Sequence, residues 1–265
     1  MIRRLITLGA ACALAGGMVV LGAPAMAGAS SDSATCSGPT GPGHFERLVV
    51  PPGAHCQING RVSVDAPLRI GAGALVFVSP TAQLRVDGSL TLERGAVLAA
   101  PQNTSPIDVD GSVHVRSGAV LLIGTETPGG PLVNRIDGPV LGDDATGVQI
   151  HNASIDGPVS LRGGGADNPA ADQAAGNQPV NFNDLEDNHI DGPVSVRGYA
   201  GIWAGVIRNH IDGNLTFTNN TDKDEFDIGS NVVDGNARCT GNNPAVNTGG
   251  SPGSPNTVEG HNTCG

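Results

Sequence analysis

Residues 188–197 read Asn-His-Ile-Asp-Gly-Pro-Val-Ser-Val-Arg, and residues 209–218 repeat the pattern as Asn-His-Ile-Asp-Gly-Asn-Leu-Thr-Phe-Thr. The tripeptide inside this stretch, Ile or Val followed by Asp or Asn and then Gly, recurs at eight positions. Its glycines are Gly60, Gly88, Gly111, Gly138, Gly157, Gly192, Gly213 and Gly235. Their spacing centres on about 22 residues, and such a period is typical of repeat architectures.

Apolar and polar residues alternate after these glycines, as in Val194-Ser195-Val196. The alternation predicts short strands with one buried face. The equivalent apolar pairs are Val62/Val64, Leu90/Leu92, Val113/Val115, Val159/Leu161 and Leu215/Phe217. No useful helical periodicity follows residue 27. Strands repeated without helices predict an all-β, single-domain parallel β-solenoid of about eight coils spanning residues 58–238.

Two rows of polar residues are expected to stack between coils. Three residues before the repeat Asp lie Asn134, Asn188, Asn209 and Asn231, with Asn152 one position out. In-phase asparagines predict a hydrogen-bonded ladder. Five residues after the repeat Gly lie Asp65, Glu93, Arg116, Asp143, Arg162 and Arg197. The run from Glu93 to Arg162 alternates in charge, which favours this register.

The repeat aspartates lie directly before the corner glycines. They are Asp87, Asp110, Asp137, Asp156, Asp191, Asp212 and Asp234. We expect each Asp-Gly pair to form a turn in which Asp accepts a backbone N–H and Gly supplies a positive φ. A calcium ladder is the alternative, because calcium prefers several carboxylate oxygens. Asn59 fills the same position in the first copy, which favours the turn and predicts no cofactor.

The composition limits both the core and the partners. The chain has 40 glycines, 19 prolines and only 3% aromatic residues, so the core must consist of Val, Leu, Ile and Ala. A net charge of −11 excludes a generic nucleic-acid binder, since no basic stripe is present. Residues 163–179 interrupt the repeat with a low-complexity insertion that is expected to be a mobile loop.

The first 27 residues are typical of a secretory signal peptide. Arg3 and Arg4 precede an apolar stretch, and Ala25-Met26-Ala27 forms a small-residue cleavage motif. We therefore expect a secreted, extracellular protein that has no membrane span after signal removal. Cys36, Cys56, Cys239 and Cys264 remain in the mature chain. Of three possible pairings in an oxidising compartment, Cys36–Cys56 and Cys239–Cys264 are favoured, since each closes a short loop.

The two ends differ from the repeats. Residues 28–57 predict an irregular amino-terminal cap, and residues 239–265 predict a disulfide-closed tail that folds over the last coil. Both ends would shield an open sheet edge from aggregation. Capped ends favour a monomer.

The sequence resembles secreted right-handed parallel β-helix proteins, and more narrowly a group of exported proteins of actinobacterial type. The ending Cys239-Thr-Gly-Asn-Asn-Pro244, followed by Pro255-Asn-Thr-Val-Glu-Gly260 and Cys264, is similar to the ending of that group. The resemblance covers about residues 36–264. It implies the handedness of the coil and an exported protein, and it brings no catalytic residues to this chain.

Three groups of side chains are candidates for binding. His189 and His210 are expected to stack, and with Asp187 they could hold a metal, although we predict none. Tyr199 and Trp203 form a candidate sugar-stacking platform, with core packing as the alternative. Arg162 and Arg197 share one phase, and Arg208 lies near them in sequence, which gives a candidate cationic patch for a lyase.

We predict no catalytic residues. Gly142-Asp143-Asp144 is similar to the acidic motif of pectin-cleaving β-helix hydrolases, but the companion motifs of that family are absent. The leading hypothesis is an exported, non-catalytic β-solenoid that acts as a structural or binding module of the cell envelope or extracellular matrix. Its expected partner is a polysaccharide or an envelope component. The alternative is a polysaccharide lyase or glycoside hydrolase that acts on an extracellular polymer.

Overall fold

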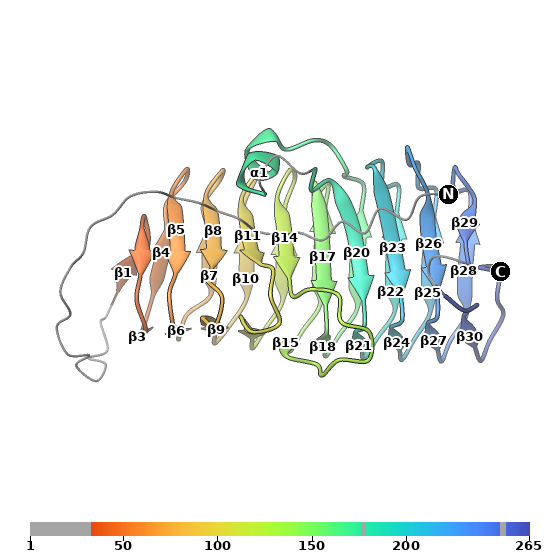
Figure 1. Ribbon diagram of the computed structural model, residues 1–265, viewed down its shortest axis with the longest axis horizontal. Helices are drawn as coiled ribbons and strands as arrows, with labels where there is room; N and C mark the ends of the chain where they lie inside the picture. Colours follow the sequence, from red (N-terminus) through yellow and green to blue (C-terminus); the bar gives the residue numbers. More distant parts are fainter. Residues whose placement is uncertain (1–32, 176–178, 250–252) are drawn as a thin grey trace.

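The described part of the chain winds into a parallel β-solenoid with ten coils (Figure 1). The computed structural model describes residues 33–175, 179–249 and 253–265. Each coil supplies one strand to each of three ten-stranded parallel sheets, here called sheets I, II and III. The signal peptide predicted over residues 1–27 lies outside the described residues.

The strands of each sheet follow one another at intervals of three in chain order. Sheet I contains β1 (Ala34–Thr35), β4 (Leu48–Val50), β7 (Leu68–Ile70), β10 (Leu90–Leu92), β13 (Val113–Val115), β16 (Val140–Asp143), β19 (Val159–Arg162), β22 (Val194–Arg197), β25 (Leu215–Thr218) and β28 (Ala237–Thr240). Sheet II contains β2 (Pro39–Thr40), β5 (His55–Ile58), β8 (Leu75–Val78), β11 (Val97–Ala100), β14 (Val120–Ile123), β17 (Gly147–His151), β20 (Phe182–Glu186), β23 (Trp203–Ile207), β26 (Phe226–Gly229) and β29 (Val246–Asn247). Sheet III contains β3 (Gly43–Phe45), β6 (Arg61–Val64), β9 (Gln83–Val86), β12 (Ile107–Val109), β15 (Asn134–Ile136), β18 (Ala153–Ile155), β21 (His189–Ile190), β24 (His210–Ile211), β27 (Val232–Val233) and β30 (Thr257–Val258).

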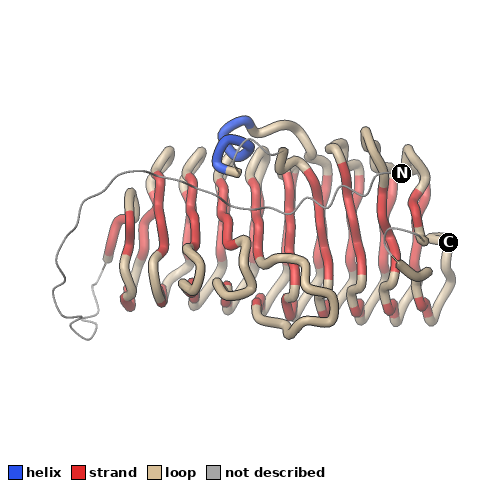
Figure 2. Tube along the Cα trace, viewed as in Figure 1, coloured by secondary structure: helices blue, strands red, loops and turns tan. Residues whose placement is uncertain are grey.

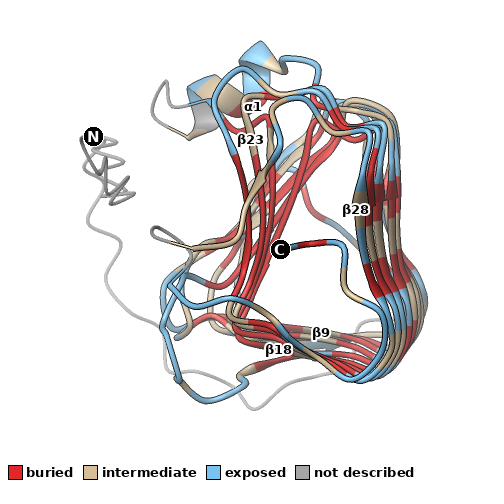
Figure 3. Cartoon of the chain, turned by 90° about the vertical axis from the view of Figure 1, so that its right-hand side faces the viewer, coloured by how far each residue is buried: buried red, intermediate tan, exposed pale blue. Residues whose placement is uncertain are grey.

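Loops and turns join the strands at the corners of each coil (Figure 2). The three sheets form the sides of the solenoid, and buried residues line all three and form one hydrophobic core (Figure 3). Alternate residues of each strand point inward, as the period-two pattern predicted. On β22, for example, Val194 and Val196 are buried, whereas Arg197 is exposed. The hydrophobic core is built mainly from Val, Leu, Ile and Ala, as the composition required.

The solenoid has more coils than the eight copies of the repeat indicated. Seven copies follow strands of sheet III, but Ile58-Asn59-Gly60 follows β5 of sheet II. Val62 and Val64 therefore pair with Leu84 and Val86 of β9 and are not in register with Leu90 and Leu92. The coil that ends in Val64 turns through Asp65-Ala66 in place of Asp-Gly, so this corner lacks the repeat tripeptide.

The expected irregular cap is wrong over most of its length. From Ala34 onward, residues 28–57 supply β1 to β4 and most of β5, and the tail supplies β29 and β30. Prolines and strands of only two or three residues obscured the alternation in these segments. The disulfides Cys36–Cys56 and Cys239–Cys264 are confirmed, and they join neighbouring coils at the two ends.

The positive φ expected of the repeat glycines is found at Gly60 and Gly88, with φ of 80° and 153°, and not at the later copies. Gly111, Gly138 and Gly157 do not adopt a positive φ. Instead, a Cβ on Gly138 would lie 3.0 Å from the carbonyl carbon of Gly111 in the preceding coil. A Cβ on Gly157 would lie at the same distance from the carbonyl carbon of Gly138. Glycine is thus needed because successive corners stack too closely for a side chain.

The asparagine ladder is confirmed and extends one coil further. Asn188 Nδ2 donates to Asn209 Oδ1 at 3.0 Å, and Asn209 Nδ2 donates to Asn231 Oδ1 at 3.1 Å. Asn231 Nδ2 in turn donates to Asn256 Oδ1 at 2.7 Å. Asn134 is buried in the same row, where its Oδ1 accepts from the backbone N–H of Ile107. The row fixes the corner between sheets II and III.

Part of the insertion at residues 163–179 is ordered against the solenoid. It contains the helix α1 (Pro169–Ala174), whose N-cap Asn168 accepts from the backbone N–H of Ala171. Ala171 packs with Val97, Val120 and Val180 on the outer face of sheet II. Within the ranges given above, no helix is long and apolar enough to cross a membrane.

Candidate functional site

The residues predicted for binding lie on different faces of the solenoid. Arg162 and Arg197 are register partners on β19 and β22, and both are exposed on sheet I. His189 and His210 are register partners on sheet III. Trp203 begins β23 of sheet II. These side chains therefore do not form one site.

The proposed platform of Tyr199 and Trp203 is wrong, because the two rings do not share a surface. Tyr199 is only 1% exposed and belongs to the core. Burial, with a smaller contribution from Asp222, raises the pKa of its hydroxyl. Trp203 is half-buried and packs edge-on against Phe182, with ring centroids 6.2 Å apart. Its indole Nε1 donates to Asp227 at 3.3 Å.

The charge row has the expected register but few of the expected contacts. Asp143 and Arg162 are register partners, and Arg162 is followed by Arg197. In the described part of the chain, Glu93 and Arg116 are the only pair of this row within 4.0 Å, at 3.5 Å. Asp143 and Asp144 are exposed, and nothing in the described residues encloses them as a catalytic pair.

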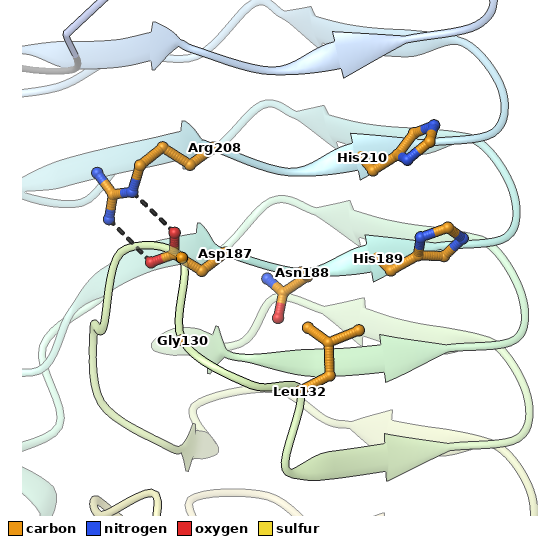
Figure 4. A pocket seen from close by; sticks show the side chains of 8 residues that line it. Gly130, Leu132, Asp187, Asn188, His189, Arg208 and His210 are labelled. Carbon is orange, nitrogen blue, oxygen red and sulfur yellow. Dashed lines mark hydrogen bonds and ion pairs between the residues drawn. The ribbon is translucent and has the colours of Figure 1, made fainter.

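The two stacked histidines contact corner aspartates. Their ring centroids lie 4.8 Å apart. His189 Nε2 lies 2.8 Å from Asp191 and 3.7 Å from Asp212, and His210 Nε2 lies 3.4 Å from Asp212 and 3.6 Å from Asp234. Asp187, which the sequence offered as a third ligand, points to Arg208 instead (Figure 4).

A cluster of buried polar side chains occupies the outer face of sheet II. Gln149 and His151 lie on β17, and their register partners on β20 are Asp184 and Glu186. Although these side chains point away from the core, His151 is 6% exposed, Asp184 9% and Glu186 5%. His151 Nε2 lies 3.6 Å from Asp184 Oδ2. This group is called the buried cluster below.

Arg208 closes one side of the buried cluster. Its Nη2 donates to Glu186 Oε2 at 2.6 Å and to Asp187 Oδ2 at 3.0 Å, while its Nε donates to Asp187 Oδ1 at 2.9 Å. Asp187 and Arg208 have φ values of 58° and 57°, in the left-handed region that side chains rarely adopt. The residues that follow them, Asn188 and Asn209, belong to the asparagine ladder, and its hydrogen bonds hold this corner in place.

The segment between β14 and β15, residues 124–133, covers the cluster from outside and reaches across later coils (Figure 1). Its Glu126 accepts from Arg208 Nη2 at 3.0 Å. Asn103 Nδ2 donates to the backbone oxygen of Thr125 and to Thr127 Oγ1, both at 2.9 Å. These bonds fix the segment, which is called the cover loop below.

Burial changes the protonation of the cluster. Burial raises the pKa of Glu186 to about 7, against the opposing effect of Arg208. Burial, together with the nearby Glu186, raises the pKa of Asp184 well above its ordinary value. Burial lowers the pKa of His151 to about 4, so its imidazole is neutral at pH 7. The guanidinium of Arg208 therefore has four carboxyl groups near it. They belong to Glu126, Asp184, Glu186 and Asp187.

Three atoms of the buried cluster lack a hydrogen-bond partner among the described residues. They are Gln149 Nε2, His151 Nδ1 and Asp184 Oδ1. A buried polar atom without a partner costs about 1–3 kcal/mol, so native proteins usually satisfy such atoms with protein groups, water or ions. The three atoms lie on two neighbouring strands, Gln149 and His151 on β17 and Asp184 on β20.

A shallow cavity of about 340 Å³ lies beside the cluster (Figure 4). Its lining combines the cover loop with the corner of sheets II and III, and consists of Gly129, Gly130, Leu132, Asp187, Asn188, His189, Arg208 and His210. Arg208 therefore separates this open cavity from Glu186 and the enclosed side of the cluster. The cavity brings together His189, His210 and Arg208, which the sequence suggested separately.

The sequence reasoning did not find His151, Asp184 or Glu186. All but one of the repeat glycines are followed by strands of sheet I, and only the strands after these glycines were aligned with one another. His151, Asp184 and Glu186 lie on strands of sheet II, which come before the asparagine row in each coil. A signal was present, because Gln149-Ile-His151-Asn152 and Asp184-Leu-Glu186-Asp187-Asn188 both alternate around a buried aliphatic residue. The insertion between them lengthens that repeat and hid the alignment.

Comparison with family models, with curated proteins and with solved structures found no match to this chain.

Proposed function

We propose that the protein is an exported, non-catalytic β-solenoid that binds a hydroxyl-rich extracellular polymer, either a polysaccharide or a component of the cell envelope. The observation that carries the proposal is the arrangement around Arg208. The groups suited to acid–base chemistry are enclosed on one side of it, and the shallow cavity lies open on the other side. Such an arrangement favours recognition over catalysis.

The cavity has groups that suit a sugar. Arg208 and the two imidazoles of His189 and His210 offer donors, and Gly129 and Gly130 also line the cavity. Leu132 is 46% exposed at the rim and offers an apolar contact for the face of a sugar ring. A few convergent polar groups around an apolar surface are typical of small-ligand sites. The two disulfides accord with an oxidising extracellular location.

The test is binding to a panel of polysaccharides by co-sedimentation, followed by calorimetry with soluble oligosaccharides of any polymer that binds. We expect Leu132→Ser and His189→Gln to weaken binding about tenfold each, equivalent to about 1.4 kcal/mol. Val49→Ser is the matched control, since Val49 is 42% exposed on sheet I, away from the cavity. Equal weakening by the control, or no binding to any polymer, would contradict the proposal.

One observation favours an enzyme as the second candidate. Asp184 and Glu186 form a carboxyl pair, and a pKa of about 7 suits Glu186 to act as a general acid. Catalysis would require the cover loop and Arg208 to move, because both restrict access to the pair. Release of reducing ends or unsaturated products by the wild type, lost in Glu186→Gln, would establish the enzyme; we expect no release from any polymer.

A further inference from the structure

We propose that His151, Asp184 and Glu186 form a binding site for a zinc ion, with water completing the coordination. The proposal is independent of the polymer-binding function, because the site lies on the enclosed side of Arg208. The three residues come from two adjacent parallel strands whose register is fixed on both sides by further coils. Side chains on such strands are placed more rigidly than side chains on loops.

The distances suit a zinc ion. One ligand atom from each of the three residues lies within 4.8 Å of the others, and His151 Nε2 lies 3.6 Å from Asp184 Oδ2. Zinc bonds of about 2.0–2.2 Å to nitrogen and oxygen place the ligand atoms of a tetrahedral site about 3.4 Å apart. Small side-chain rotations would therefore bring all three atoms to bonding distance.

The unpartnered atoms are the independent observation that points to a bound ion. The His151 side chain is more than nine-tenths buried, with 8% exposed, Asp184 is buried beside it, and each has one polar atom without a partner. Asp184 Oδ1 has free lone pairs for a zinc ion, whereas His151 would bind through Nε2, the nitrogen that faces Asp184, and its Nδ1 would then donate to a water outside the metal. Gln149 Nε2, the third unpartnered atom, is a donor beside Asp184 and is suited to a hydrogen bond with a zinc-bound water.

Charge and donor type also favour zinc. Arg208 takes Glu186 Oε2 and both oxygens of Asp187, which leaves the Asp184 carboxyl without a cation of its own. A divalent cation would offset this excess of carboxyl groups. The imidazole ligand selects against calcium, which takes six to eight oxygen ligands, and one histidine with two carboxylates is a donor set that zinc accepts.

The test uses the disulfide-intact mature protein after treatment with a chelator. Titration with Zn²⁺ is followed by calorimetry, and titration with Co²⁺ by the visible absorption that tetrahedral cobalt gives. We expect one zinc per chain and an at least tenfold loss of affinity in both Asp184→Asn and Glu186→Gln. Circular dichroism of each variant reports whether it folds. If His151→Gln fails to fold, the two near-isosteric carboxamide variants still decide the matter.

The surface histidines supply the matched control. His189 with Asp191 and Asp212, and His210 with Asp212 and Asp234, also bring three ligand atoms together, but they are largely exposed. The double variant His189→Gln/His210→Gln should bind zinc as the wild type does. The proposal is overturned if the wild type binds no zinc, or if the double variant loses the zinc that Asp184→Asn retains.

Discussion

Two regions of sheet II, β11 with β14 and β17 with β20, have the same backbone architecture but differ in the side chains on their outer faces. On β11 and β14 the outward residues include Val97 and Val120, which are covered by α1. On β17 and β20 they include Gln149, His151, Asp184 and Glu186, and the cover loop reaches this group through the contact of Glu126 with Arg208. The inward residues are mainly aliphatic in both regions, for example Leu121 and Ile150, with Asn183 of β20 as a buried polar exception. The inner face therefore sets the fold, and the outer face is free to vary.

The two regions also differ at their corners. The polar region has the buried asparagine row, which runs from Asn188 through Asn209 and Asn231 to Asn256. The corresponding corner after β11 is instead a longer segment that contains Pro101 and Pro106. A row of fully bonded amides permits charged residues such as Arg208 to take a strained corner position beside it.

The strongest test of the comparison uses two neighbouring leucines on β14. Leu121 points into the core and Leu122 points outward, at the border of the two regions. We expect Leu121→Ala to lower the free energy of unfolding by about 2–5 kcal/mol, because it leaves a cavity in a packed core. Leu122→Ala should cost about half as much. Urea unfolding measures both, and equal costs would mean that the inner face does not dominate.

Next in size is the loss of one amide from the buried row. Asn209→Ala removes an acceptor for the backbone N–H and side chain of Asn188 and a donor to the backbone oxygen of Leu185. We expect a loss of about 2–3 kcal/mol, since buried groups lose their partners.

Asn214 provides the control for that change. It accepts from Asn236 in the same manner but is exposed, so Asn214→Ala should cost below about 1 kcal/mol. Similar losses for both variants in urea unfolding would show that burial is not what makes the row important.

A smaller effect concerns pH. The pKa of His151 falls to about 4 on folding from an ordinary value of 6.5, so the unfolded chain binds the extra proton between these values. Its contribution therefore destabilises the fold as pH drops, by about 2 kcal/mol between pH 7 and pH 5. The raised pKa of Glu186 acts in the opposite direction, because the folded state then holds the proton up to about pH 7.

His151→Gln separates these two effects. With chelator present, its unfolding free energy should decline more steeply from pH 5 to pH 7 than that of the wild type, because only the carboxyl contribution remains. Urea unfolding at a series of pH values measures the slope. Identical slopes would show that His151 is not neutral and enclosed in the folded protein.

The smallest expected effect lies on sheet III, in the coils of the apolar region. Arg85 contacts Asp87, Asp108 and Asp110 at 2.8, 2.7 and 2.6 Å. Because these groups are partly exposed, Arg85→Gln should cost below about 1 kcal/mol and the cost should vanish near 1 M salt. Arg61→Gln is the control, since Arg61 bonds the neutral Gln83. A cost that persists in high salt would contradict the assignment to exposed ion pairs.

The sequence was sufficient for the features that repeat in phase. The asparagine row and the inward position of Val194 and Val196 follow from spacing alone, whereas the disulfide pairing was favoured among three because each bridge closes a short loop. Tyr199 could not be placed, because an aromatic residue at a corner faces inward or outward according to the coil above it. Asp184 and Glu186 were missed because they become a pair with His151 only when a strand on the far side of the insertion is aligned with β17.

The asparagine row has a direction, and this direction bears on how the chain is completed. Each asparagine of the row donates its Nδ2 to the Oδ1 of the asparagine in the coil that follows. The hydrogen bonds of each coil are therefore complete only after the next coil has folded. A chain that folds from its amino terminus thus always has, in its most recently folded coil, an asparagine Nδ2 without its acceptor. Asn256, in the last coil, supplies the final acceptor, and loss of the last ten residues would leave Nδ2 of Asn231 without it.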